Sequence, residues 1–174
     1  MIKAVFLDRD GVVNRAFVRN TVPTPPRTLD EVEILSGVKE SILLLKQHNF
    51  EVVIVTNQPD AERGLVTRDS VNQINELLKV KLGVNHFYTC FHDDSDKCNC
   101  RKPEPGLILE AAQDLAIDVS RSFLVGDRWR DILAGQRAGC ECFFIDYNYV
   151  DKPPSLPYTR VYSLNEATQM ILEK

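Results

Sequence analysis

Short apolar runs alternate with segments of helical periodicity along most of this 174-residue chain. The apolar runs are rich in β-branched and aromatic residues and predict buried strands, at Lys3–Leu7, Glu51–Val55, Phe87–Thr89, Ser122–Val125 and Cys142–Ile145. The segments between them predict helices, at Gly37–His48, after Thr67, at Pro105–Ala116, at Arg130–Ala138 and after Ser163. Such alternation is typical of a parallel sheet covered by helices. The sequence therefore predicts an α/β fold, a three-layer αβα sandwich of Rossmann-like topology.

Length and charge limit the classes of protein to consider. A chain of 174 residues fits one domain, so we expect residues 1–174 to form a single unit. No apolar run approaches the roughly 20 residues that span a bilayer, which argues against a membrane protein. The net charge of −4 lacks the basic excess of a nucleic-acid binder. Asp8 lies too early for a secretory signal, so we expect a cytoplasmic protein, acting as a monomer.

Acidic and hydroxyl side chains follow several of the predicted strands. Asp8 and Asp10 come after the first strand, Thr56 after the second, and Asp127 after the fourth. In open parallel sheets, ligands bind beyond the carboxyl ends of the strands, so these side chains can converge. Clustered carboxylates repel one another unless a cation lies among them, and oxygen ligands suit Mg²⁺. The sequence predicts a magnesium site at this edge of the sheet.

Two further residues extend this constellation toward phosphoryl transfer. Lys102 supplies a positive charge that can bind a phosphate oxygen, and Thr56 supplies a hydroxyl. Carboxylates serve as nucleophiles through aspartyl-phosphate intermediates, and catalysis of phosphoryl transfer is mostly positioning and charge stabilisation. A carboxylate, a metal, a hydroxyl and a lysine therefore indicate a phosphoryl-transfer enzyme.

Four short motifs carry a resemblance to a known family. Each is weak alone, but they occur in order at strand ends or helix starts: FLDRDG at Phe6–Gly11, TNQ at Thr56–Gln58, RKP at Arg101–Pro103 and GDRWRD at Gly126–Asp131. Together they resemble the four motifs of the haloacid dehalogenase-like hydrolases, over most of Lys3 to Ile145. This resemblance implies a phosphatase that works through an aspartyl-phosphate.

The resemblance also implies roles for individual residues. Asp8 would attack phosphorus, and Asp10 would act as general acid and then general base. Asp8, the backbone carbonyl of Asp10 and Asp127 would hold Mg²⁺. Thr56 and Lys102 would steady the phosphoryl group. Asp131 would orient Lys102 or a metal-bound water.

A second set of possible metal ligands lies in the loop 90–100. Cys90, His92, Cys98 and Cys100 fall within eleven residues, and tetrahedral Zn²⁺ takes such Cys₃His sets. With all four positions filled by protein, the zinc would be structural and would fix the loop ahead of Lys102. The alternative is that these are surface thiols beside an unrelated histidine. The remaining cysteines, Cys140 and Cys142, are expected in the core.

The position of this loop, directly ahead of RKP, resembles that of a zinc loop in one subgroup of the family. That subgroup contains phosphatases that act on the 7-phosphate of a heptose 1,7-bisphosphate and phosphatases that act on histidinol phosphate. The subgroup has no separate cap domain. We expect 12–36 and 59–66 to be loops without regular structure around an open pocket. The resemblance assigns substrate contacts to Ala16–Arg19, Thr56, Asn57, Gln58, Pro59, Arg101 and Lys102. We add Arg128, which lies beside Asp127.

A polyanionic substrate needs local positive charge in an acidic protein. Candidates are Arg9, Arg63, Arg101, Lys102 and Arg128. A second phosphate would explain these arginines best, which favours a sugar bisphosphate; histidinol phosphate is the nearest alternative. A phospho-accepting receiver domain is disfavoured. In a receiver the acceptor aspartate follows the third strand, whereas here Asp8 follows the first, and a receiver has no need of a second acid such as Asp10 two residues later. A non-catalytic scaffold clipped by zinc is disfavoured by the intact acids.

Overall fold

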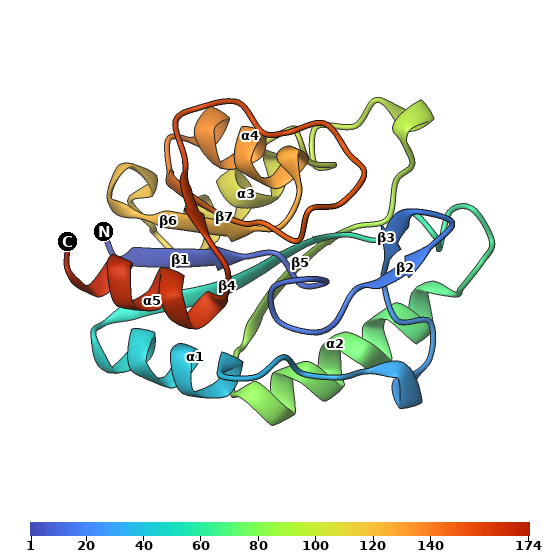
Figure 1. Ribbon diagram of the computed structural model, residues 1–174, viewed down its shortest axis with the longest axis horizontal. Helices are drawn as coiled ribbons and strands as arrows, with labels where there is room; N and C mark the ends of the chain where they lie inside the picture. Colours follow the sequence, from blue (N-terminus) through green and yellow to red (C-terminus); the bar gives the residue numbers. More distant parts are fainter.

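The computed structural model describes all 174 residues and is built around a six-stranded sheet with β1 (Lys3–Leu7) near its centre (Figure 1). The strand order is β5-β4-β1-β6-β7-β8, and every pairing is parallel. The other five strands are β4 (Phe50–Asn57), β5 (His86–Cys90), β6 (Phe123–Gly126), β7 (Glu141–Ile145) and β8 (Thr159–Val161). The predicted parallel α/β sheet is confirmed.

Helices cover both faces of this sheet. Figure 1 shows that one face carries α1 (Val38–Gln47), α2 (Arg68–Leu82) and α5 (Leu164–Leu172). The other face carries α3 (Gly106–Asp114) and α4 (Trp129–Ala138). Helix α2 begins where the sequence predicts it, because the Thr67 side chain accepts a hydrogen bond from the Ser70 amide. None of these helices combines the length and apolar character needed to cross a bilayer.

The two hydrophobic cores follow from the alternation of side chains along buried strands. In β1, Val5 and Leu7 pack into the core beneath α1 and α5, whereas Ala4 and Phe6 pack into the core beneath α3 and α4. Because both faces are covered, the strands are apolar at consecutive positions, as the sequence predicts. Cys140 and Cys142 are buried in the second core, as predicted.

The expectation that 12–36 lacks regular structure is wrong. An antiparallel hairpin, β2 (Phe17–Arg19) and β3 (Val22–Thr24), lies within it, followed by a short 3₁₀ helix. The hairpin turn uses Asn20 and Thr21, both with positive φ, instead of the Asn-Gly pair that usually marks such turns. Strand β8 was also not predicted. Strands of three residues are too short to give an apolar alternation that sequence reasoning can detect.

We expect the core beneath α3 and α4 to be sensitive to truncation. Leu124 is fully buried on β6, so Leu124→Ala should lower the free energy of unfolding by about 2–5 kcal/mol in urea titrations. Leu43→Ala is the matched control because Leu43 is mostly exposed on α1, and it should change stability by less than about 0.5 kcal/mol. Equal effects of the two substitutions would contradict this packing.

Candidate active site

Two aspartates meet because the strands that carry them are neighbours. Asp8 directly follows β1 and Asp127 directly follows β6, and the register pairs Leu7 with Val125. The Asp8 amide continues the ladder by donating to the Val125 carbonyl at 3.0 Å. With Asp131, which lies in the first turn of α4, they form a buried group whose carboxylate oxygens lie within 4.8 Å of one another. The predicted acidic cluster is therefore present at the carboxyl edge of the sheet.

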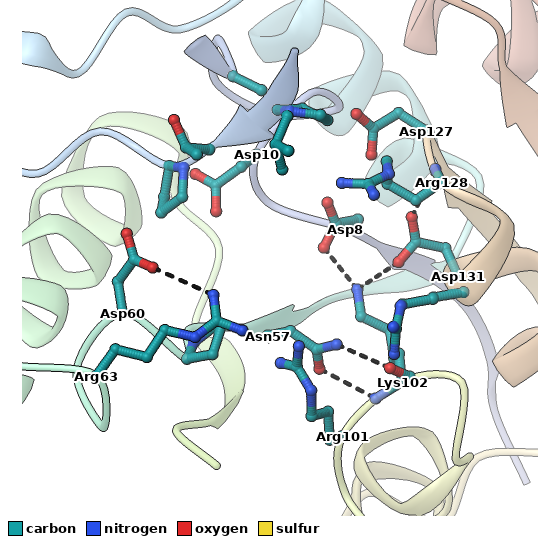
Figure 2. A pocket seen from close by; sticks show the side chains of 17 residues that line it. Asp8, Asp10, Asn57, Asp60, Arg63, Arg101, Lys102, Asp127, Arg128 and Asp131 are labelled. Atoms are coloured by element: carbon teal, nitrogen blue, oxygen red, sulfur yellow. Dashed lines mark hydrogen bonds and ion pairs between the residues drawn. The ribbon is translucent and has the colours of Figure 1, made fainter. Parts of the chain in front are cut away.

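Lys102 lies within this cluster, as Figure 2 shows. Its ammonium donates to Asp8 Oδ1 at 2.5 Å and to the Val55 carbonyl at 2.8 Å, and lies 2.7 Å from Asp131 Oδ1. Burial by itself lowers the pKa of Lys102, but the charges of Asp131 and Asp8 outweigh it and raise the pKa above its usual value. The lysine is therefore charged although it is buried.

Asn57 holds the backbone of Lys102 at the end of β4. Its side-chain amide donates to the Lys102 carbonyl and its Oδ1 accepts from the Lys102 amide, both at 3.0 Å. This reciprocal pair fixes the lysine backbone without using the ammonium (Figure 2). Asn57, predicted as a substrate contact, lines the pocket and also supports the loop that carries RKP.

Asp10 is held by four donors. Arg9 donates to both carboxylate oxygens at 3.1 and 3.2 Å, Asn14 donates to Oδ1 at 2.9 Å, and Gln58 donates to Oδ2 at 2.7 Å. The prediction that Arg9 supplies charge to a substrate is wrong, because Arg9 is completely buried and its other contact is Asn75. Arg9 instead orients the carboxylate of Asp10.

Thr56 and Gln58 lie next to the pocket, not in its wall. Both are 1% exposed, and Gln58 Nε2 donates to Thr56 Oγ1 at 2.9 Å as well as to Asp10. The other predicted contacts that line the pocket are Ala16, Pro59, Arg101 and Arg128. In this arrangement Gln58 links the hydroxyl of Thr56 to the carboxylate of Asp10.

The acids nearest the sheet resist ionisation, because burial and mutual repulsion favour their neutral forms. Burial raises the pKa of Asp8 to about 7, although Lys102 opposes this shift. Burial, followed by the charges of Asp8 and Asp131, raises the pKa of Asp127 well above its usual value. Both oxygens of Asp127 are buried and have no hydrogen-bond partner. Unpartnered carboxylate oxygens beside two other acids fit a hard divalent cation.

Gly11 is required by the close approach of this carboxylate. Its φ is +100°, and a Cβ at this position would overlap the side chain of Asp127. Any larger residue would therefore be strained in backbone conformation and would displace an acid of the cluster.

The pocket over these acids has a volume of about 230 Å³ and is rich in charge. Its positive side chains are Arg63, Arg101, Lys102, Arg128 and Arg130, and its acids include Asp60. Arg130 was missed by sequence reasoning, because its position in the first turn of α4 gives no signal of where its side chain lies. The β2–β3 hairpin supplies part of the wall through Val22, Pro23 and Thr24.

Each arginine of the pocket rim has a carboxylate partner from another segment. Arg63 contacts Asp93 at 2.5 and 2.9 Å, and Arg128 contacts Asp151 at 2.6 and 2.7 Å. Asp151 belongs to the segment after Ile145, for which the sequence gives no functional signal. The same segment contacts the motif that carries Asp8, because Tyr147 donates to the Gly11 carbonyl at 2.9 Å. The chain after β7 thus helps to shape the site.

The four predicted zinc ligands also come together. Their donor atoms are separated by 3.0 Å for Cys90 and Cys100, 3.3 Å for His92 and Cys100, and 3.7 Å for Cys90 and Cys98, and all four lie within 4.8 Å of one another. Four ligands around a tetrahedral zinc at about 2.3 Å stand roughly 3.8 Å apart, close to these separations. The Arg101 amide donates to Cys98 Sγ at 3.3 Å. The cluster is therefore coupled to the RKP segment and has the donor set of a structural zinc site.

The sequence matches the family described as haloacid dehalogenase-like hydrolase over residues 26–139. Taken with the relatives below, this match shows that the chain belongs to that family of hydrolases. The D-glycero-beta-D-manno-heptose-1,7-bisphosphate 7-phosphatase of Helicobacter pylori (strain J99) is 35% identical, with 78% of each chain covered. The enzyme of the same name from Pasteurella multocida is also 35% identical, covering 79% of this chain and 78% of its own.

A solved structure supports the same relationship. The D,D-heptose 1,7-bisphosphate phosphatase of B. bronchiseptica, complexed with magnesium and phosphate, gives a TM-score of 0.84 at 29% identity. The match covers 99% of both chains. The sandwich described above is therefore the fold of a haloacid dehalogenase-like phosphatase over nearly its whole length.

We expect the charge of Asp8 to cost stability in the absence of a divalent cation. The pKa of the Asp8 carboxyl is about 7 in the folded protein, above the ordinary value of 3.8 that applies in the unfolded chain. The folded state therefore loses stability as pH rises from about 4 to about 7. At pH 8, without metal, Asp8→Asn should be more stable than the wild type by about 1–4 kcal/mol in urea unfolding.

This advantage of Asp8→Asn should shrink toward zero near pH 3, where the folded wild type and most of its unfolded chain are protonated at this position. Asp30→Asn, at an exposed acid without an ion pair, is the control and should have little effect at either pH. An Asp8→Asn protein less stable than the wild type at pH 8 would contradict the account.

Proposed function

We propose that the chain is a magnesium-dependent phosphatase that hydrolyses a phosphomonoester through an aspartyl-phosphate on Asp8. The proposed substrate is a sugar bisphosphate, with the 7-phosphate of D-glycero-D-manno-heptose 1,7-bisphosphate as the reacting group. The observation that carries the proposal is the buried cluster of Asp8, Asp127, Asp131 and Lys102 beneath a pocket rimmed by arginines. The names of the relatives support the substrate.

Asp8 is the proposed nucleophile. One carboxylate oxygen attacks phosphorus, the bond between phosphorus and the ester oxygen breaks, and Asp10 gives a proton to that leaving oxygen. Water then attacks the phosphorus of the aspartyl-phosphate, Asp10 takes its proton, and inorganic phosphate leaves with Asp8 restored. Lys102 fixes Asp8 Oδ1 at 2.5 Å, which leaves Oδ2 as the attacking atom.

The magnesium site would comprise Asp8, the backbone carbonyl of Asp10 and Asp127. When bound, the cation supplies positive charge that offsets the repulsion among carboxylates and the charge on the phosphoryl oxygens. The unpartnered oxygens of Asp127 support this assignment. Asp131 contacts both Lys102 and the Arg128 amide, the latter at 2.9 Å, and would hold the lysine in place. Thr56 and Lys102 would steady the phosphoryl group.

The loop 90–100 is proposed to bind a structural zinc through Cys90, His92, Cys98 and Cys100. It would hold Arg101 at the pocket rim, because that residue follows the last ligand and its amide contacts Cys98. Arg101 and Arg128 are proposed to bind the second phosphate, together with Asn57 and Pro59, which line the pocket. We propose one functional unit over residues 1–174, acting as a cytoplasmic monomer on a small metabolite, with neither nucleic acid nor membrane as partner.

Phosphate release from a panel of phosphomonoesters tests this function. With Mg²⁺, we expect the heptose 1,7-bisphosphate to be preferred over its 1-phosphate, histidinol phosphate and nucleotides. Chelation should abolish turnover, and Asp8→Asn should lower kcat by at least about 10³-fold, because the nucleophile is lost. Preference for histidinol phosphate would move the assignment to that alternative, and turnover that survives in Asp8→Asn would refute the mechanism.

We expect about one zinc per chain in protein purified without chelator, measured by elemental analysis. Cys98→Ala should lose this zinc and unfold at a lower temperature, because the loop loses its cross-link. Cys140→Ala is the matched control, since Cys140 is a buried cysteine outside the group of four clustered ligands, and it should keep the zinc. Wild-type protein without zinc, or zinc retained in Cys98→Ala, would refute the site.

A further inference from the structure

We propose that Asp94 is a positioning residue that holds Arg101 and Arg130 together as one anion-binding pair at the rim of the pocket. The pair would bind the substrate's anionic group that lies away from the reacting phosphate. This inference rests on the proposed phosphatase function and adds two residues to it, Asp94 and Arg130.

A single carboxylate oxygen joins the two arginines. Asp94 Oδ1 accepts from Arg101 Nε at 2.8 Å and from Arg130 Nη1 at 3.1 Å. The arginines come from different parts of the fold, the RKP segment and the first turn of α4. Two guanidinium groups this close repel each other unless an anion lies between them. Asp94 therefore brings together two positive charges that would otherwise separate.

The pair keeps donors available for a ligand. Arg101 donates from Nε to Asp94 and from Nη1 to the His92 carbonyl at 3.4 Å. Arg130 donates from Nη1 to Asp94. Arg101 Nη2 and the Nε and Nη2 groups of Arg130 make no hydrogen bond to the protein. Both arginines line the same pocket as Asp8. A planar guanidinium with free donors matches the geometry of a phosphate group, and two of them match a dianion.

The backbone of Asp94 is held in place by its own short helix. The Asp93 side chain accepts from the Asp94 amide at 2.8 Å, and Asp96 Oδ2 accepts from the Asp93 amide at 2.7 Å. Asp93 also binds Arg63 of the pocket wall. The polar stretch between His92 and Cys98 is thus more than a spacer between metal ligands, because its two leading acids contact three arginines that line the pocket.

Asp94 is exposed enough that its positioning role can be tested without a change in the stability of the protein. Its side chain is 57% exposed, against 12% for Arg101 and 31% for Arg130. Ion pairs this accessible to solvent contribute little to folding. Replacement of Asp94 should therefore leave the unfolding temperature almost unchanged while it frees the two arginines to move.

Steady-state kinetics with two substrates that differ only in the second phosphate test the proposal. For the heptose 1,7-bisphosphate, Asp94→Ala should raise KM about five- to tenfold and leave kcat within about twofold. For the heptose 7-phosphate, both constants should stay near wild-type values. Glu104→Ala is the matched control, because it removes a similar surface pair, with Arg137 at 2.7 Å, that does not line the pocket.

A loss of affinity that is equal for the two substrates, or a lower KM for the bisphosphate, would overturn the proposal. The second outcome would mean that Asp94 screens the arginines instead of positioning them. If the triple variant Asp94→Ala, Arg101→Gln, Arg130→Gln binds the bisphosphate more weakly than the Arg101→Gln, Arg130→Gln protein, Asp94 acts without the arginines and the proposal also fails.

A binding measurement separates this inference from the proposed function. Trp129 is the one tryptophan of the chain, and the Arg130 guanidinium lies 4.8 Å from its ring centre. Its fluorescence can therefore report binding of the heptose 1,7-bisphosphate without turnover. If the wild type binds but hydrolyses nothing, the function fails, and weaker binding by Asp94→Ala still supports the positioning role. If the wild type neither binds nor hydrolyses the bisphosphate, both fail.

Discussion

The ammonium group of Lys102, buried between two carboxylates, joins the parts of the molecule on which the site depends. Its three acceptors are Asp8 after β1, the Val55 carbonyl on β4, and Asp131 on α4. A buried charge is tolerated only where partners of opposite charge compensate it. One lysine cannot neutralise three clustered acids, so Asp127 keeps unpartnered oxygens. This imbalance is what makes the cluster a site for a cation instead of a closed ion-pair network.

Around this centre, each reacting group is oriented by neighbouring side chains. Arg9, Asn14 and Gln58 direct the carboxylate of Asp10, and Asn57 fixes the backbone of Lys102. Such supporting contacts matter because phosphoryl transfer depends mainly on position and charge. The pattern extends to the rim, where carboxylates from the loop 90–100 and from the segment after β7 hold the arginines.

The pocket wall was the part of the fold that sequence reasoning described least well. The β2–β3 hairpin has strands of three residues and a turn without glycine, so neither alternation nor turn chemistry reveals it. The segment after Ile145 contains no motif, yet Tyr147 contacts Gly11 in the first of the four motifs and Asp151 contacts Arg128 in the last. Short elements are stabilised by contacts with the rest of the molecule instead of by local preference, and those contacts are not visible in a single sequence.

The sequence by itself determined the parallel sheet apart from β8, the convergence of Asp8 and Asp127, and the four-ligand loop. These follow from local patterns, because apolar runs set the strands and parallel strands deliver the residues after them to one edge. Only the tertiary structure decided which arginines serve the pocket. Arg9 turns into the interior toward Asn75, whereas Arg130 reaches the rim. Arg9 pairs with Asn75 and Arg130 with Asp94, residues that are distant in the sequence. Which arginine becomes buried and which stays at the rim is decided only when the sheet and helices pack together.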